Sequence, residues 1–126
     1  MLGGKEATAS LGVRNIEVAK RFYEGTLGLK KLPGEEPGAL VYKSGSSTIL
    51  VYESQYAGTN RATAVTWDVG KDVDDVVKTL RAKGVTFEKY DIPGTTRQGD
   101  IHVQGKRRLA WFKDPDGNTI AVFQPE

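Results

Sequence analysis

Residues 7–13 alternate apolar and polar side chains, the pattern of a β-strand that buries one face. A helix is predicted to follow, with Asn15 as its N-cap residue and Gly25 at its end. The apolar side of this helix consists of Ile16, Ala19, Phe22 and Tyr23. A loop over residues 32–38 then leads into a predicted hairpin over residues 39–53. The first half of the chain is therefore predicted to run strand, helix and further strands.

After a linker over residues 55–61, the same series begins again with a predicted strand over residues 63–69. Asp72 is the predicted N-cap of the second helix, and Gly84 its predicted end. Four apolar residues recur there at the spacing of one helix face: Val73, Val76, Val77 and Leu80. Further strands are predicted over residues 85–90 and 100–103, followed by a turn at Gly105 and a closing hairpin.

The closing hairpin, residues 109–124, is a second copy of the hairpin at residues 40–52. In both hairpins a Lys ends the first strand and Thr-Ile begins the second. The turn at residues 114–118, Asp-Pro-Asp-Gly-Asn, has turn-forming residues throughout, so its carboxylates are predicted to be structural. The repeat predicts an α+β fold in one domain, residues 1–126, with βαβββ modules at about 6–55 and 62–126. A pseudo-twofold axis would relate the modules, whose mixed sheets would form a concave cleft.

The composition is that of an ordinary globular protein, with 38% hydrophobic and 27% charged residues. A formal net charge of +2 is too small to predict nucleic-acid binding, and the absence of cysteine excludes disulfides and thiolate ligands. No apolar run approaches the roughly 20 residues of a membrane helix, and the N-terminus lacks the apolar core of a signal peptide. We therefore expect a cytoplasmic protein with no nucleic-acid or membrane partner.

The helix segment 18–29 and the hairpin segment 111–118 resemble those of the vicinal oxygen chelate superfamily. That superfamily groups glyoxalase I, extradiol dioxygenases and bleomycin-resistance proteins, and the resemblance covers nearly the whole chain. The resemblance implies a glyoxalase-like fold that binds a small molecule in its cleft. It also implies a homodimer, because proteins of this superfamily commonly dimerise. It does not imply one reaction, because this fold serves many functions.

Metal-containing members of the superfamily take four metal ligands from equivalent strand positions, two in each module. The resemblance places these positions at Thr8, Leu50, Ala64 and Ala121. The internal repeat gives the same register, because the offset from Val13 to Val69 also takes Thr8 to Ala64. Of the four residues only Thr8 has a side-chain oxygen, and the chain holds a single His. We therefore predict no metal and no other cofactor.

The former ligand positions define the sheet face on which a ligand would bind. Strand alternation gives this face as Thr8, Ser10, Leu50, Tyr52, Ala64, Thr66, Ala121 and Phe123. If Lys113 pairs with Thr119, Trp111 falls opposite Ala121 and joins the face. If the turn at residues 104–107 is tight, Asp100 and His102 join it as well. The predicted site is apolar and aromatic, as small-molecule pockets commonly are.

Three functions follow from this site. The leading hypothesis is a metal-independent protein that binds a small, neutral or anionic aromatic molecule, because a cationic drug of the bleomycin type would require a more acidic site. The alternative is a metal-free enzyme of isomerase or lyase type, in which Asp100 orients His102 as the catalytic base. For His102 a surface position in the hairpin is the other interpretation, and the one we favour. The third hypothesis, a metal-dependent lyase or dioxygenase, is disfavoured because the residues at the four metal-ligand positions are not ones that bind metals.

Overall fold

The computed structural model describes residues 1–34 and 36–126, which form two compact units. The first unit contains residues 1–59 together with residues 115–118. The second contains residues 60–114 and 119–126. The turn of the closing hairpin therefore belongs to the first unit, although its two strands belong to the second.

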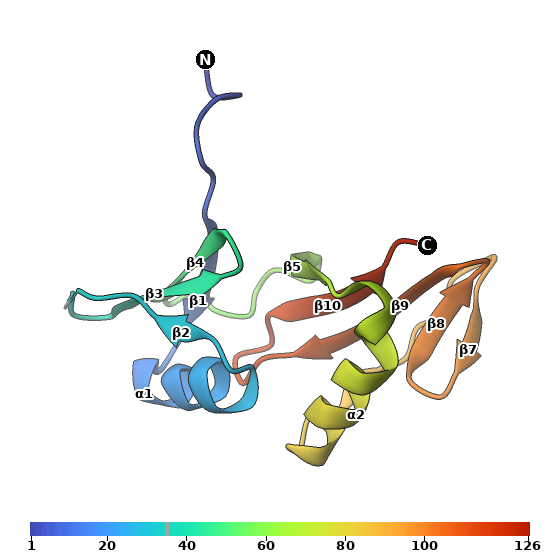
Figure 1. Cartoon of the computed structure of the whole chain (residues 1–126). Coiled ribbons are helices and arrows are strands. Elements are labelled where there is room, and N and C mark those ends of the chain that lie inside the picture. The colour runs from blue at the N-terminus through green and yellow to red at the C-terminus, as the bar shows by residue number, and fades with distance from the viewer. Residues whose placement is uncertain (35) are drawn as a thin grey trace. The chain divides into compact units, whose positions relative to one another are not determined.

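The first unit is a four-stranded mixed sheet with one helical segment against it. Its elements are β1 (Ala9–Val13), α1 (Ile16–Lys20), the π-helical η1 (Arg21–Thr26), β2 (Lys30–Lys31), β3 (Ala39–Ser44) and β4 (Ser47–Glu53). The strand order is β1-β4-β3-β2, with β1 parallel to β4 and the other pairs antiparallel. The helical segment lies along one face of this sheet (Figure 1).

Asn15 is the N-cap residue of α1, as its sequence position predicted. Its side-chain oxygen accepts hydrogen bonds from the backbone N–H of Glu17 at 2.9 Å and of Val18 at 3.1 Å. These two bonds satisfy amide groups that have no partner inside the helix. The cap therefore fixes the point at which the chain leaves β1 and enters the helix.

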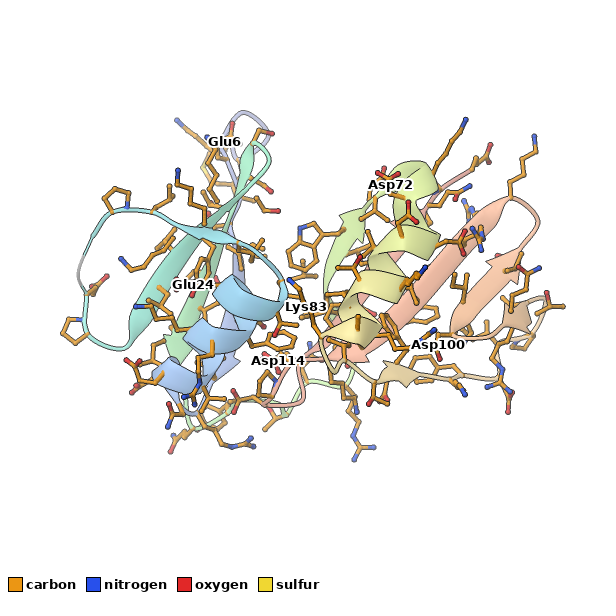
Figure 2. All side chains as sticks on the ribbon, turned by 60° about the horizontal axis from the view of Figure 1, so that its bottom comes forward. Glu6, Glu24, Asp72, Lys83, Asp100 and Asp114 are labelled. Atoms are coloured by element: carbon orange, nitrogen blue, oxygen red, sulfur yellow. The ribbon has the colours of Figure 1, made fainter. Side chains whose placement is uncertain are left out.

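The core of the first unit lies between its helical segment and its sheet. Its buried members include Leu11, Val13, Ala19, Tyr23, Tyr42, Ile49 and Val51. Within this core the Tyr42 hydroxyl donates a hydrogen bond at 2.9 Å to a carboxylate oxygen of Glu24, which is labelled in Figure 2. Burial and the neighbouring Glu24 carboxylate raise the pKa of Tyr42 far above its usual range, so the phenol stays protonated.

The acidic turn at residues 115–118 is structural, as predicted. The Asn118 side-chain amide donates to the Gly12 carbonyl at 2.8 Å, and the Asp116 carboxylate accepts from the Arg14 backbone N–H at 3.0 Å. Gly58 lies so close to this turn that a Cβ atom there would overlap the Asp116 carbonyl. The turn is therefore held by backbone and side-chain contacts to the first unit.

The second unit is a six-stranded mixed sheet with one helix. Its elements are β5 (Thr63–Asp68), the 3-10 turn η2 (Gly70–Asp72), α2 (Val73–Ala82), β6 (Phe87–Glu88), β7 (Thr96–Gln98), β8 (Ile101–Gln104), β9 (Arg107–Lys113) and β10 (Thr119–Gln124). The strand order is β5-β10-β9-β8-β7, and β6 also pairs with β9. As β1 does with β4, β5 runs parallel to β10, so the two units repeat one topology. The predicted α+β fold of repeated modules is confirmed.

Asp72 is the N-cap residue of α2, as predicted, but its side chain makes no cap hydrogen bond. The chain enters α2 through the 3-10 turn η2, which ends at Asp72. Asp68 instead accepts a hydrogen bond from the Gly70 N–H at 3.0 Å and supports this turn. The helix then buries Val73, Val77 and Leu80 in the second core, as their spacing predicted. Among the described residues no helix is long and apolar enough to cross a bilayer.

Candidate functional site

The face of the first sheet that points away from α1 carries apolar side chains. Ser10 lies beside Leu50 in the parallel pair, and Leu50 lies opposite Val41 in the antiparallel pair, so all three share this face. Tyr52 follows two residues after Leu50 and lies on the same side. Val41 and Tyr52 are each 38% exposed. We call this surface the open face of the first sheet.

The four positions of the superfamily's metal ligands do not fit a metal ion. The Thr8 hydroxyl, the one oxygen among them, makes a hydrogen bond of 2.7 Å with the Thr48 hydroxyl. Leu50 in the first unit, and Ala64 and Ala121 in the second, have hydrocarbon side chains. Elsewhere in the part of the chain that the structure describes, no group of three or more His, Asp or Glu side chains could hold a metal.

The register of the second sheet confirms the predicted strand pairing. Lys113 lies opposite Thr119, and Trp111 lies opposite Ala121. Ala121 lies beside Thr66 on the other strand. Side chains of directly paired residues point to one side of a sheet, so Trp111 and Thr66 share the face of Ala121. The Trp111 indole N–H donates to the Thr63 hydroxyl at 3.2 Å, which fixes the ring.

Three rings form a cluster on this face of the second sheet. The His102 ring packs edge-on against Trp111 at a centroid distance of 4.9 Å, and Tyr90 lies 5.3 Å from Trp111 and 6.0 Å from His102. His102 is fully buried, so the favoured prediction that it is a surface residue of the hairpin is wrong. Its burial comes from Tyr90, whose place beside His102 no local sequence pattern indicated.

The hydrogen bonds of His102 fix its ring without the help of Asp100. Its Nε2 accepts a hydrogen bond from the Tyr90 backbone N–H at 3.0 Å and lies 3.2 Å from the Tyr90 carbonyl oxygen. Its buried Nδ1 has no hydrogen-bond partner among the described residues. The Asp100 carboxylate, labelled in Figure 2, instead forms an ion pair with Arg81 of α2. The structure therefore does not bring the predicted catalytic pair, His102 and Asp100, together.

One more predicted site residue, Phe123, lies on the face of the second sheet that strand alternation assigned to it. Phe123 follows two residues after Ala121, so its side chain lies on the same face of the second sheet. In contrast to Ala121, which is buried, Phe123 is half-buried and Thr66 is exposed. With the side chains in their present positions, the residues of the second sheet that could touch a ligand are therefore Thr66, Trp111 and Phe123.

Among the described residues, two surface hollows each lie within one unit, and no predicted site residue lines either of them. The first, of about 510 Å³, lies in the first unit and is lined by Ile16, Glu17, Lys20, Lys31, Gly34, Glu36, Pro37, Gly38, Ala39 and Leu40. The second, of about 330 Å³, lies in the second unit and is lined by Tyr90, Asp91, Ile92, Pro93, Thr95 and Arg97. Tyr90 connects the second hollow to the ring cluster.

The Glyoxalase/Bleomycin resistance protein/Dioxygenase superfamily matches residues 7–122 by its sequence profile. The chain belongs to this superfamily.

Solved structures agree on the fold. The fosfomycin resistance protein FosX of Listeria monocytogenes aligns with a TM-score of 0.75 and 15% identity, over 100% of this chain and 96% of its own. An integron cassette protein from the mobile metagenome of V. cholerae aligns with a TM-score of 0.66 and 24% identity, over 100% of this chain and 98% of its own. No curated protein sequence matches the chain. At these identities the structural likeness shows the fold alone.

Proposed function

We propose that this protein is a metal-independent binding protein of its superfamily, whose ligand is a small, neutral or anionic aromatic molecule. The observation that carries the proposal is the apolar character of the open face of the first sheet. A sheet face turned toward water is ordinarily polar, whereas this one exposes Val41 and Tyr52 beside Leu50. Exposed apolar side chains that lie side by side favour a binding surface over an ordinary solvated face.

The polar groups around this patch favour a ligand that carries no positive charge. Lys43 lies opposite Thr48 and Lys30 opposite Lys43, so the two ammonium groups share the open face at one edge of the patch. No described carboxylate forms an ion pair with either Lys. Like charges on directly opposite residues repel each other, and a bound anion would relieve that repulsion. The ring of Tyr52 would stack on the aromatic part of the ligand.

The proposal assigns ligand contacts on each sheet considered by itself. They are Thr8, Ser10, Leu50 and Tyr52 on the first sheet, and Thr66, Trp111 and Phe123 on the second, where Ala121 is buried. The alternative of proton transfer by His102 has less support, because its Nε2 is bonded to the Tyr90 backbone and Asp100 is paired with Arg81. The proposal also includes a homodimer, which the superfamily resemblance suggests, and a cytoplasmic location.

A thermal-shift screen of aromatic acids, amides and phenols tests the proposal. A compound present at 100 times its Kd is expected to add about 2.7 kcal/mol to the free energy of unfolding. The Tyr52→Ala variant is expected to lose at least about tenfold in affinity, because the stacking ring is removed. Tyr56→Ala is the control: Tyr56 is 69% exposed, lies in the turn after β4 and is not among the proposed ligand contacts.

Two results would contradict the proposal. In the first, no aromatic compound raises the melting temperature, or Tyr52→Ala and Tyr56→Ala bind equally well. In the second, elemental analysis of the purified protein finds a stoichiometric transition metal. Size-exclusion chromatography with light scattering tests the expected homodimer separately, by measuring the mass in solution.

A further inference from the structure

The hollow of about 330 Å³ in the second unit combines an aromatic wall with one cationic group, Arg97, and one carboxylate, the fully exposed Asp91. Its apolar lining comes from Tyr90, Ile92 and Pro93, and the first two are each 37% exposed. Arg97 supplies the positive charge, and Thr95 lines the hollow beside it. Small-molecule pockets begin at about 300 Å³ and combine an apolar lining with a few polar groups. We call this feature the Tyr90–Arg97 hollow.

The Arg97 guanidinium is weakly engaged by the protein itself. Asp91 is the one described carboxylate within ion-pair distance, at 4.0 Å, and the Asp91 side chain is fully exposed. Such a pair is screened by water and salt and contributes little. The Arg97 side chain is itself 42% exposed, so its planar set of N–H donors is open to an incoming anion.

The strand register connects this Arg to the ring cluster. Arg97 of β7 lies directly opposite His102 of β8, so both side chains point to the face that carries Trp111. The buried Nδ1 of His102 has no hydrogen-bond partner among the described residues. Buried polar atoms of this kind are ordinarily satisfied by water or by a ligand.

We propose that the Tyr90–Arg97 hollow binds the carboxylate of a small aromatic acid. Arg97 would pair with the carboxylate oxygens through two N–H groups, and the Tyr90 ring would lie against the aromatic ring of the acid. This inference goes beyond the proposed function, because the hollow is a second site and none of the ligand contacts proposed above lines it. A cationic ligand is disfavoured, because the Arg97 guanidinium would repel it. The Asp91 carboxylate would offset little of this repulsion, since it is fully exposed to water.

Benzoate and 4-hydroxybenzoate are suitable probes, with benzamide as the neutral compound of the same shape. Titrations followed by 1H–15N correlation spectra should shift the amide signals of Tyr90 and Arg97 with benzoate. Benzamide should bind at least about tenfold more weakly, because it cannot form the charge-assisted pair. Arg97→Gln should reduce benzoate affinity by about tenfold or more and leave benzamide affinity unchanged. Arg107→Gln is the control, an exposed Arg at the start of β9 that does not line the hollow.

Equal binding of benzoate and benzamide would overturn this inference while leaving an aromatic ligand for the protein intact. Equal affinity of benzoate for the Arg97→Gln and Arg107→Gln variants would also overturn it. Failure of both acids to shift the Tyr90 and Arg97 signals would do the same, whatever the wider compound screen finds. Circular dichroism of both variants shows whether they are folded, which separates loss of binding from loss of structure.

Discussion

Replacing Gly58 by Ala tests how firmly the acidic turn at residues 115–118 is held. Gly58 has a φ of +72°, and a Cβ placed on it would lie 3.1 Å from the Asp116 carbonyl carbon and closer still to its oxygen. The turn cannot move away freely, because Asn118 is bonded to the Gly12 carbonyl. Gly45, in the first hairpin, has a φ of +58° and open space around its Cβ position, so it is the matched control.

The two variants share one cost and differ in another. A non-Gly residue at positive φ costs about 1–2 kcal/mol, which applies to both Gly45→Ala and Gly58→Ala. Inserting a methyl group into a tightly packed site costs about 1–3 kcal/mol, which applies only to Gly58→Ala. We therefore expect a loss of about 2–5 kcal/mol for Gly58→Ala, against about 1–2 kcal/mol for Gly45→Ala.

Urea unfolding followed by circular dichroism measures both losses, with equal m-values as the condition for comparing them. Equal destabilisation of the two variants would refute the reasoning. It would mean that the turn moves aside from Gly58 without cost, and that its hydrogen bonds to Gly12 and Arg14 do not hold it.

Two further predictions concern pairs of ionisable side chains, one in each unit. Tyr42→Phe removes the hydrogen bond to Glu24 from a buried site and should cost about 1–3 kcal/mol in urea unfolding; a loss below about 0.5 kcal/mol would show that the bond is not formed. In the second unit, the hydrogen bonds from Arg108 lower the pKa of Asp74. The charged carboxylate therefore stabilises the fold above the ordinary Asp pKa of about 3.9, and this contribution is lost as the pH falls through the lowered pKa. At neutral pH the free energy of unfolding of the wild type should exceed that of Asp74→Asn by at most about 1 kcal/mol, because the Asp74 side chain is 63% exposed. This difference in stability should vanish in acid. A difference that does not change with pH would contradict the ion pair.

The sequence by itself determined the features that depend on neighbours along the chain. The cap at Asn15 depends on the backbone N–H groups of Glu17 and Val18, which follow it by two and three residues. The pairing of Trp111 with Ala121 depends only on the length of one turn, since a hairpin loop sets the register of its strands. The repeat of two hairpins was sufficient to predict the repeated module, because each copy carries the same strand and turn pattern.

Tertiary structure decided the features that depend on residues from separate elements. Asp100 lies near His102 in sequence, but its carboxylate reaches Arg81 because the tight turn before β8 points it toward α2. His102 is buried by Tyr90, twelve residues earlier, through a backbone hydrogen bond that no periodicity encodes. Alternation within a strand assigns a side chain to a face, but only the packing of other elements decides whether that side chain meets water, an ion or a ring. For this reason the sequence identified the faces of the sheets, and the structure identified the partners of the groups upon them.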